Sequence, residues 1–255
     1  MAIPTQTAAL GAVTAAAAAR NNSLVAAQLS NAAAVRSTYS TLELSAQRDG
    51  RSWEAGCVRL GMTARTSIFS QTPTMDELVA FFRTPCEWIY LSGHYLYGSG
   101  RFYSDKGVGM VFLDDGVSVT VAGEKRTLTK AGGDFRLHVG CTLVVFAACS
   151  ALRQESHIRT FRTLFDKPVL LGYAAGTGVA INNDMLGGGG IAHAFFSRVR
   201  NKRAQKDRNA ARDAWMETAN AGFGGGVIED MFRAVDEDGQ EWTLSRKTIV
   251  KGRKM

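Results

Sequence analysis

A histidine and a cysteine each follow a short apolar run that predicts a buried β-strand. His94 closes the stretch that begins at Tyr90, and Cys149 follows the apolar run 144–148. An imidazole beside a thiol either removes its proton or stabilises the thiolate, which is the nucleophilic form. The pair therefore predicts nucleophilic catalysis by Cys149, with His94 as its acid–base partner.

The surrounding pattern predicts an α/β domain that positions these two side chains. Apolar runs at 87–91, 142–147 and 168–173 are of the kind that fill a sheet covered on both faces. Thr74 followed by Glu77 forms a capping box that opens an amphipathic helix. In a parallel sheet, reacting groups gather at the carboxyl ends of the strands, and His94 and Cys149 both occupy such positions.

Two turn signals predict β-hairpins. Asp114-Asp115-Gly116 joins two β-rich runs between the His94 and Cys149 strands, and a second turn at 236–239 joins two runs near the C-terminus. We expect the first hairpin to be a small β-ribbon inserted into the α/β domain.

Composition limits the classes of protein and the compartment. The chain has 255 residues, of which 45% are hydrophobic, so it can bury a large core without disulfide bonds. Its four cysteines are few, dispersed and without C-x-x-C spacing, so we expect free thiols, no metal, no other cofactor and a cytoplasmic location. No run approaches the roughly twenty apolar residues of a membrane span, and residues 1–30 lack the features of a secretory signal.

The net charge of +7 is concentrated at 198–212 and 246–255. We interpret these stretches as a solvated helix face and a frayed end. Nucleic-acid binding is the weaker alternative, since no aromatic residues are interleaved with the charges. The cations that it would use are Lys202, Arg203, Lys206 and Arg208.

The sequence around both reactive residues resembles the caspase-like cysteine peptidases of clan CD, which include caspases, metacaspases, gingipains, separase and the bacterial CHAT proteases. Members have a Ser/Gly-His-Gly turn after one strand, a β-ribbon insertion, and an apolar-Ala-Cys-x-Thr/Ser segment after the next strand. The matching segments here are 92–94, 113–116 and 144–151. The order of His94 and Cys149 also agrees, and the pattern is most similar to CHAT-type members over about residues 67–220.

This resemblance implies a three-layer sandwich with a mainly parallel sheet, a β-ribbon insertion and an N-terminal helical extension. It implies a cysteine endopeptidase that cleaves protein or peptide substrates. Cys149 would attack the scissile carbonyl, His94 would protonate the leaving amine, and the backbone N–H groups of Tyr95 and Cys149 would form the oxyanion hole. The candidate pocket residues are Gly93, Asp134, Ser150 and Tyr173, with Asp134 favouring Arg or Lys before the cleaved bond.

Three parts are expected along the chain. Residues 1–60 form an Ala-rich helical extension, residues 61–222 the caspase-like core, and residues 223–255 a hairpin with a basic tail. The N-terminal helices are a candidate docking surface for a regulatory partner, and a low-complexity arm at 7–36 is the alternative interpretation.

Two residues leave alternatives open. Tyr95 stands where the family usually has glycine, and a side chain there restricts the backbone and crowds the pocket. It favours a second hypothesis, a catalytically silent caspase-like interaction module. His157 is the rival base, but its arginine-rich surroundings predict an exposed helix.

Overall fold

The computed structural model of the chain describes residues 32–33, 43–64, 68, 72–103, 107–175, 190–199, 207–222, 231–245 and 248–255. Within these ranges the chain forms five helices, one six-stranded sheet, one five-stranded sheet and a two-residue pairing of β1 (Ala32–Ala33) with β2 (Thr63–Ala64). The segment 7–36, predicted to be helical, lies outside the described residues except for residues 32–33, which form the strand β1 and not a helix.

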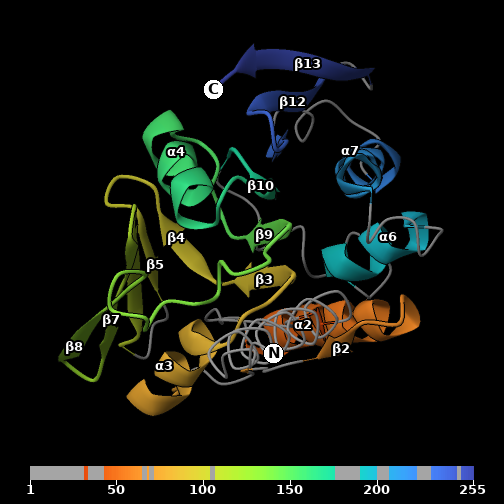
Figure 1. Cartoon of the computed structure of the whole chain (residues 1–255). Coiled ribbons are helices and arrows are strands. Elements are labelled where there is room, and N and C mark those ends of the chain that lie inside the picture. The colour runs from red at the N-terminus through yellow and green to blue at the C-terminus, as the bar shows by residue number, and fades with distance from the viewer. Residues whose placement is uncertain are drawn as a thin grey trace, which may run out of the picture.

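The central sheet has the strand order β13-β12-β11-β10-β9-β3 (Figure 1). Its strands are β3 (Trp88–Ser92), β9 (Leu143–Ala147), β10 (Val169–Tyr173), β11 (Phe232–Val235), β12 (Gln240–Ser245) and β13 (Thr248–Lys254). The three predicted apolar strands and the C-terminal hairpin are confirmed. The prediction of a mainly parallel sheet is wrong, because only β3, β9 and β10 are parallel and the last three strands are antiparallel. Few residues separate β11 from β12 and β12 from β13, and neighbouring strands so close in the chain can only pair antiparallel.

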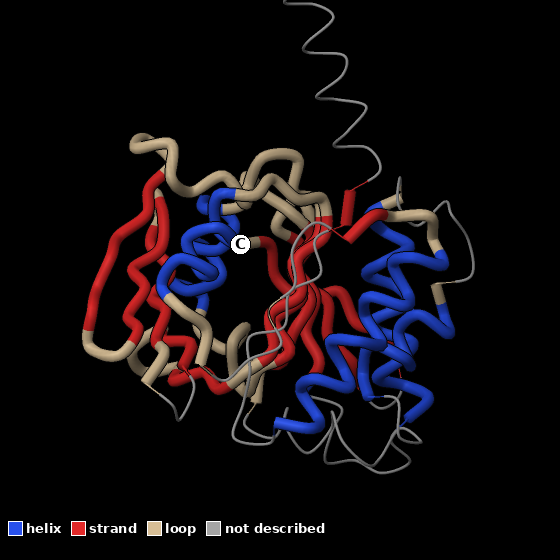
Figure 2. The backbone as a smooth tube through the Cα atoms, turned by 90° about the horizontal axis from the view of Figure 1, so that it is seen from below, coloured by secondary structure: helices blue, strands red, loops and turns tan. Residues whose placement is uncertain are grey.

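Apolar layers cover both faces of the central sheet. Along β3, Trp88 and Tyr90 face the helices α2 (Glu43–Arg59), α6 (Gly190–Arg198) and α7 (Arg208–Gly222), while Ile89 and Leu91 face the other side. On that other side lie α4 (Glu155–Leu164) and the second sheet, so Figure 2 shows the central strands between two layers. This alternation is what two buried faces require of a strand.

The second sheet is antiparallel, in the order β4-β5-β6-β7-β8. Its strands are β4 (His94–Leu96), β5 (Arg101–Tyr103), β6 (Gly109–Leu113), β7 (Gly116–Val121) and β8 (Glu124–Thr129). The predicted hairpin is β6–β7, but the insertion is larger than the expected ribbon. The strands β4, β5 and β8 were not predicted from the sequence. β4 and β5 have only three residues each and β8 is mostly polar, so none of them shows a clear apolar alternation.

The helix α3 (Met75–Arg83) packs against β7 and β8 and begins as predicted. The Thr74 hydroxyl accepts a hydrogen bond from the Glu77 N–H, and the Glu77 carboxylate accepts one from the Thr74 N–H. This reciprocal pair satisfies two of the backbone donors that a helix leaves free at its start.

The helix α2 is a layer of the same sandwich and not a separate extension. Its Trp53 is buried against Tyr90 of β3 and against Phe195 and Phe196 of α6. Gly56 has no side chain at the point where the Phe196 ring crosses, since a Cβ there would lie 2.1 Å from that ring. The two helices therefore approach closely over the sheet.

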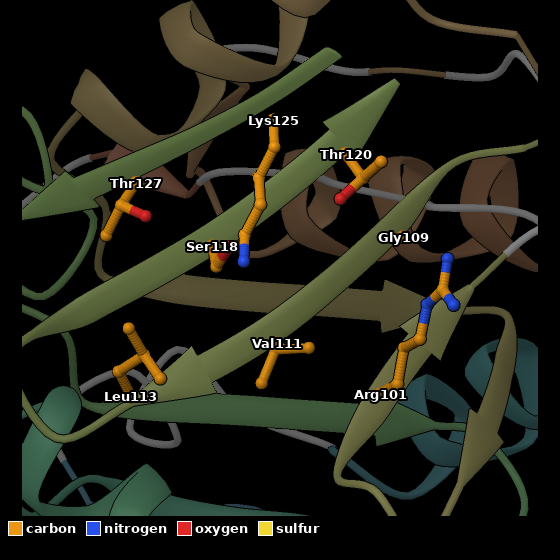
Figure 3. Close-up of a pocket in the computed structure, with 8 residues that line it drawn as sticks. All are labelled: Arg101, Gly109, Val111, Leu113, Ser118, Thr120, Lys125 and Thr127. Carbon is orange, nitrogen blue, oxygen red and sulfur yellow. The ribbon is translucent and has the colours of Figure 1, made fainter. Parts of the chain in front are cut away.

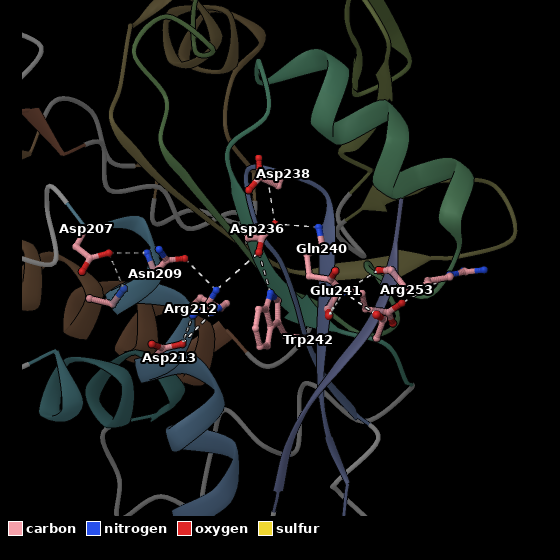
Figure 4. Close-up of polar contacts among 12 residues, drawn as sticks. Asp207, Asn209, Arg212, Asp213, Asp236, Asp238, Gln240, Glu241, Trp242 and Arg253 are labelled. Atoms are coloured by element: carbon pink, nitrogen blue, oxygen red, sulfur yellow. Dashed lines mark hydrogen bonds and ion pairs between the residues drawn. The ribbon is translucent and has the colours of Figure 1, made fainter.

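A polar network joins the C-terminal strands to α7 (Figure 4). Asp236 accepts hydrogen bonds from Trp242 Nε1 at 2.9 Å and from the Gln240 N–H at 2.8 Å. The Arg212 guanidinium of α7 lies 4.1 Å from the Trp242 ring centroid. The C-terminal tail was expected to be frayed, and that prediction is wrong, because it forms the exposed edge strand β13.

None of the helices in the described ranges combines the length and the apolar composition that crossing a bilayer requires.

Candidate active site

The strand register brings His94 and Cys149 to the same edge of the central sheet. β3 and β9 are parallel neighbours, and Ser92 lies opposite Ala147. His94 and Cys149 therefore each stand two residues beyond this last pair. Since paired strands lie about 4.8 Å apart, the two backbones leave the sheet from adjacent points.

Cys149 differs from the other cysteines in its access to solvent. All four cysteines lie in the described part of the chain and carry free thiols; Cys57, Cys86 and Cys141 are buried, whereas Cys149 is half-buried. Burial raises the pKa of Cys57, which keeps that thiol protonated. Among these thiols, Cys149 is thus the one placed to react with a substrate.

The turn after Cys149 holds an unusual backbone conformation. Ser150 has a φ of +58°, in the left-handed region that residues other than glycine seldom adopt. Its N–H donates to the Ala175 carbonyl at 3.0 Å, and the Leu152 N–H donates to the Tyr173 carbonyl at 2.9 Å. The loop carrying Cys149 is therefore fixed to the chain leaving β10, which preserves the strained turn.

His94 is held by the second sheet. It pairs with Tyr103 across β4 and β5, and the two rings stack with centroids 5.2 Å apart and planes 25° apart. Because β4 follows β3 after the single residue Gly93, the same histidine belongs to the end of the central sheet and the start of the second. The position of the imidazole is thus set by both sheets.

The Tyr95 side chain points away from His94 into the core. Neighbouring side chains on a strand face opposite sides, and Tyr95 is buried beside Phe102 and Phe161. Its hydroxyl lies 2.8 Å from Nδ1 of His157, on α4. The backbone of Tyr95 is outside the left-handed region, so the missing glycine leaves no strain at this position.

His157 does not take the place of His94. α4 is a helix as expected, but His157 is half-buried and its Nδ1 is engaged by Tyr95.

The structure does not bring all four predicted pocket residues to the site. Gly93 and Ser150 directly adjoin His94 and Cys149. The Tyr173 ring is fully buried between Trp215 and Phe232, on the face covered by α7.

Asp134 lies near the other end of the strands. Its carboxylate pairs with Arg83 at 2.5 Å, and the N–H groups of Arg136 and Leu137 donate to the carbonyl of Phe82. Arg83 ends α3 before β3 begins, so Asp134 is remote from the edge that carries His94 and Cys149.

One contact between the segments that follow His94 and Cys149 was not expected from the sequence. The guanidinium of Arg153, after Cys149, lies 4.6 Å from the ring centroid of Tyr97, after β4. Both residues are exposed, and each follows one of the two reactive residues. A cation–π contact between distant segments carries no local sequence signal, so only the fold shows it.

Within the described residues, no three His, Cys, Asp or Glu side chains are gathered so that they could hold a metal ion. No protein-family model matches the chain, and no curated protein or solved structure is similar enough to count as a match. The chemistry of the site therefore rests on its own geometry.

Proposed function

We propose that this chain is a cysteine endopeptidase in which His94 and Cys149 form the catalytic dyad. The observation that carries the proposal is the register of β3 and β9. His94 and Cys149 each follow the paired residues Ser92 and Ala147 by two positions, at the same end of two neighbouring strands. Cys149 is half-buried while the other three thiols are buried, and this difference supports the proposal.

In this mechanism the Cys149 thiolate attacks the scissile carbonyl and forms a C–S bond, and the carbonyl oxygen becomes an oxyanion. Backbone N–H groups of Cys149 and Tyr95 donate hydrogen bonds to that oxygen. His94 carries the thiol proton to the leaving amine as the C–N bond breaks. A water molecule then hydrolyses the thioester, with His94 accepting its proton and returning it to the thiolate.

A caspase-like arrangement is part of the proposal. Its support is the order of parts along the chain: strand β3, His94, an antiparallel insertion, strand β9 and Cys149. The covered central sheet is consistent with the sandwich that the family resemblance implies. The lack of disulfide bonds among these four cysteines, all in the described ranges, supports a reducing compartment such as the cytoplasm.

The test is hydrolysis of a labelled, unfolded protein and of a peptide library by purified full-length chain. Cys149→Ala and His94→Ala should each lower kcat/KM by about 10³-fold or more, with unchanged circular dichroism. Cys141→Ala and His193→Ala are the matched controls, because they remove the same side chains from a buried position and from an exposed position on α6. Full activity in Cys149→Ala would refute the dyad.

The second candidate is a silent interaction module with the same fold. Tyr95 favours it, because this residue stands where the family usually has glycine and is paired with Phe102 in a regular β-ladder. A wild-type chain that binds proteins but cleaves no member of the library would establish this candidate instead.

A further inference from the structure

His94 is the first member of a straight row of residues that crosses all five strands of the second sheet. Each member lies directly opposite the next one in the strand register. The row consists of His94, Tyr103, Gly109, Thr120 and Lys125. Side chains of Tyr95, Phe102 and Met110 are buried on the inner face, so the row lies on the outer face.

Arg101 adds a second cation to this row. It precedes Tyr103 by two residues and therefore shares the outer face. Its guanidinium lies above Gly109, where a Cβ would stand 2.5 Å from Nη2 (Figure 3). The absence of a side chain at Gly109 thus lets Arg101 reach the row between Tyr103 and Thr120.

The outer face is hollowed around these residues. A concavity of about 470 Å³ extends over β5 to β8. Its lining consists of Arg101, Gly109, Val111, Leu113, Ser118, Thr120, Lys125 and Thr127 (Figure 3). This lining offers two cations, three hydroxyls and three apolar or small positions, and no carboxylate is among these described residues.

Neither cation is neutralised within the described part of the chain. Arg101 and Lys125 have no ion pair there, whereas Arg126, on the opposite face of β8, pairs with Asp76 and Glu124. Lys125 extends over the sheet toward Ser118, into the concavity (Figure 3). Its charge therefore faces an incoming ligand.

We propose that this face binds an acidic segment of the protein that the dyad cleaves. Two unpaired cations attract carboxylates, the three hydroxyls can donate to peptide carbonyls, and Val111 and Leu113 can contact apolar side chains. Nucleic acid fits less well, because the lining has no aromatic ring for base stacking and only two cations for phosphates.

The spacing of the strands sets where the acidic residues should stand. The Arg101 guanidinium reaches the row at β6, two strands from His94, so it lies roughly 10 Å from that residue. Lys125 lies on β8, four strands from His94, at a distance of roughly 19 Å. An extended peptide advances about 3.4 Å per residue. Carboxylates about three and about six residues from the cleaved bond would therefore meet Arg101 and Lys125.

Binding is measured first, without catalysis, on the full-length Cys149→Ala chain. The probes are two fluorescein-labelled peptides of about eight residues that differ only in having Glu or Gln at two positions three residues apart. The Glu peptide should bind at least about fivefold more tightly, and added salt should reduce the difference. Equal affinity of the two peptides would overturn the proposal.

Variants test the location of the site. Arg101→Gln and Lys125→Gln should each weaken binding of the Glu peptide by about three- to tenfold, with the Gln peptide unaffected. Gly109→Ala should have a similar effect, because the new methyl group displaces the guanidinium while keeping its charge. The control is Arg136→Gln, an exposed cation in the loop beside Asp134. Equal losses in Arg136→Gln and Arg101→Gln would refute a site on this face.

Cleavage by the chain with Cys149 intact then tests the substrate assignment, which rests on the proposed function. Substrates with Glu at the two predicted distances should show higher kcat/KM than Gln substrates, and Arg101→Gln should reduce this preference by about three- to tenfold. If no peptide is cleaved but Glu peptides still bind at Arg101 and Lys125, the proposed peptidase fails while the acidic-segment site stands. An oligonucleotide that binds more tightly than the Glu peptide, with the same dependence on Arg101 and Lys125, would overturn the choice of ligand.

Discussion

The Tyr95 hydroxyl and Nδ1 of His157 share a hydrogen bond of 2.8 Å, and this bond joins the strand of His94 to the helix that follows Cys149. Burial raises the pKa of Tyr95 and lowers the pKa of His157. Both groups are therefore neutral near pH 7, and Nε2 of His157 faces Gly100. The two segments that carry the proposed dyad are thus fixed to each other beneath the site.

Replacing Tyr95 by Phe should destabilise the protein by about 1 kcal/mol, the usual net value of one hydrogen bond. The ring would keep its contacts with Phe102 and Phe161. Urea unfolding measures the loss. Tyr97→Phe is the matched control, because that exposed tyrosine contacts Arg153 through its ring, and its stability should stay within about 0.5 kcal/mol of wild type. Equal losses in the two variants would show that the Tyr95–His157 bond contributes nothing.

Stability should fall as the pH drops from about 7.5 to about 5. Burial lowers the pKa of His157, and burial together with Lys130 lowers the pKa of His138. Below the ordinary histidine pKa of about 6.5, the unfolded chain therefore binds more protons than the folded chain. The contribution is complete above that value and is lost as pH falls through the lowered pKa.

Urea midpoints across this pH range check the linkage. His157→Gln and His138→Gln should each reduce the slope of stability against pH, and the double variant should reduce it further. His193→Gln, on the exposed side of α6, should leave the slope as it is. A double variant with the wild-type slope would assign the pH dependence to other groups.

Local patterns in the sequence predict the elements that have strong local signals. The capping box at Thr74 and Glu77, the buried strands of the central sheet and the turn at 114–116 all appear as expected. Each depends on residues close together in the chain. The edge shared by His94 and Cys149 was also anticipated, because consecutive apolar strands tend to be neighbours in a sheet.

Features that depend on the three-dimensional path of the chain cannot be predicted from local sequence patterns. Tyr173 is the last residue of β10, and the alternation of side chains along this strand turns its ring toward α7. Which face of a strand meets which layer is a property of the whole sheet. The negative charge of Asp134 suggests a pocket residue, but its position depends on the loop that returns to the end of α3. The strand β13 is exposed along its whole length, so no buried face gives its residues an apolar period.

A thiol reagent should modify Cys149 first. In native protein, an aromatic disulfide should react rapidly with one thiol, and Cys149→Ala should remove that fast phase. The buried Cys57, Cys86 and Cys141 should react only when urea unfolds the chain. Mass spectrometry of the labelled protein identifies the site. Rapid modification of Cys141 in place of Cys149 would contradict the assigned accessibility.

The turn at Ser150 should accept glycine but not a β-branched residue. At a φ of +58°, glycine removes the steric cost of the side chain, which offsets the entropy that it adds to the unfolded chain. Ser150→Gly should therefore change stability by less than about 1 kcal/mol, while Ser150→Val should lower it by about 2 kcal/mol or more. Thermal unfolding compares the two. If Val is tolerated as well as Gly, the left-handed turn is absent in solution.

Asp236 should be the most sensitive charged residue of the C-terminal strands. Its carboxylate accepts three hydrogen bonds, from Trp242 Nε1 and from the N–H groups of Asp238 and Gln240, and Arg212 Nη1 lies 3.7 Å away. Because Asp236 is buried, its removal leaves these donors without a partner. Asp236→Ala should cost about 3 to 5 kcal/mol, and Asp236→Asn about 2 kcal/mol, because an amide keeps one accepting oxygen.

The matched control is Asp238→Asn, in the same turn but exposed, which should change stability by less than about 0.5 kcal/mol. Trp242 reports the same event by fluorescence, because its indole N–H loses its acceptor and its ring loses the alignment with Arg212. In Asp236→Ala, we expect the emission to change before global unfolding in urea, since β12 and β13 can separate from α7 while β3, β9 and β10 remain paired. A single transition that coincides with circular dichroism would show that the C-terminal strands unfold together with the rest of the central sheet.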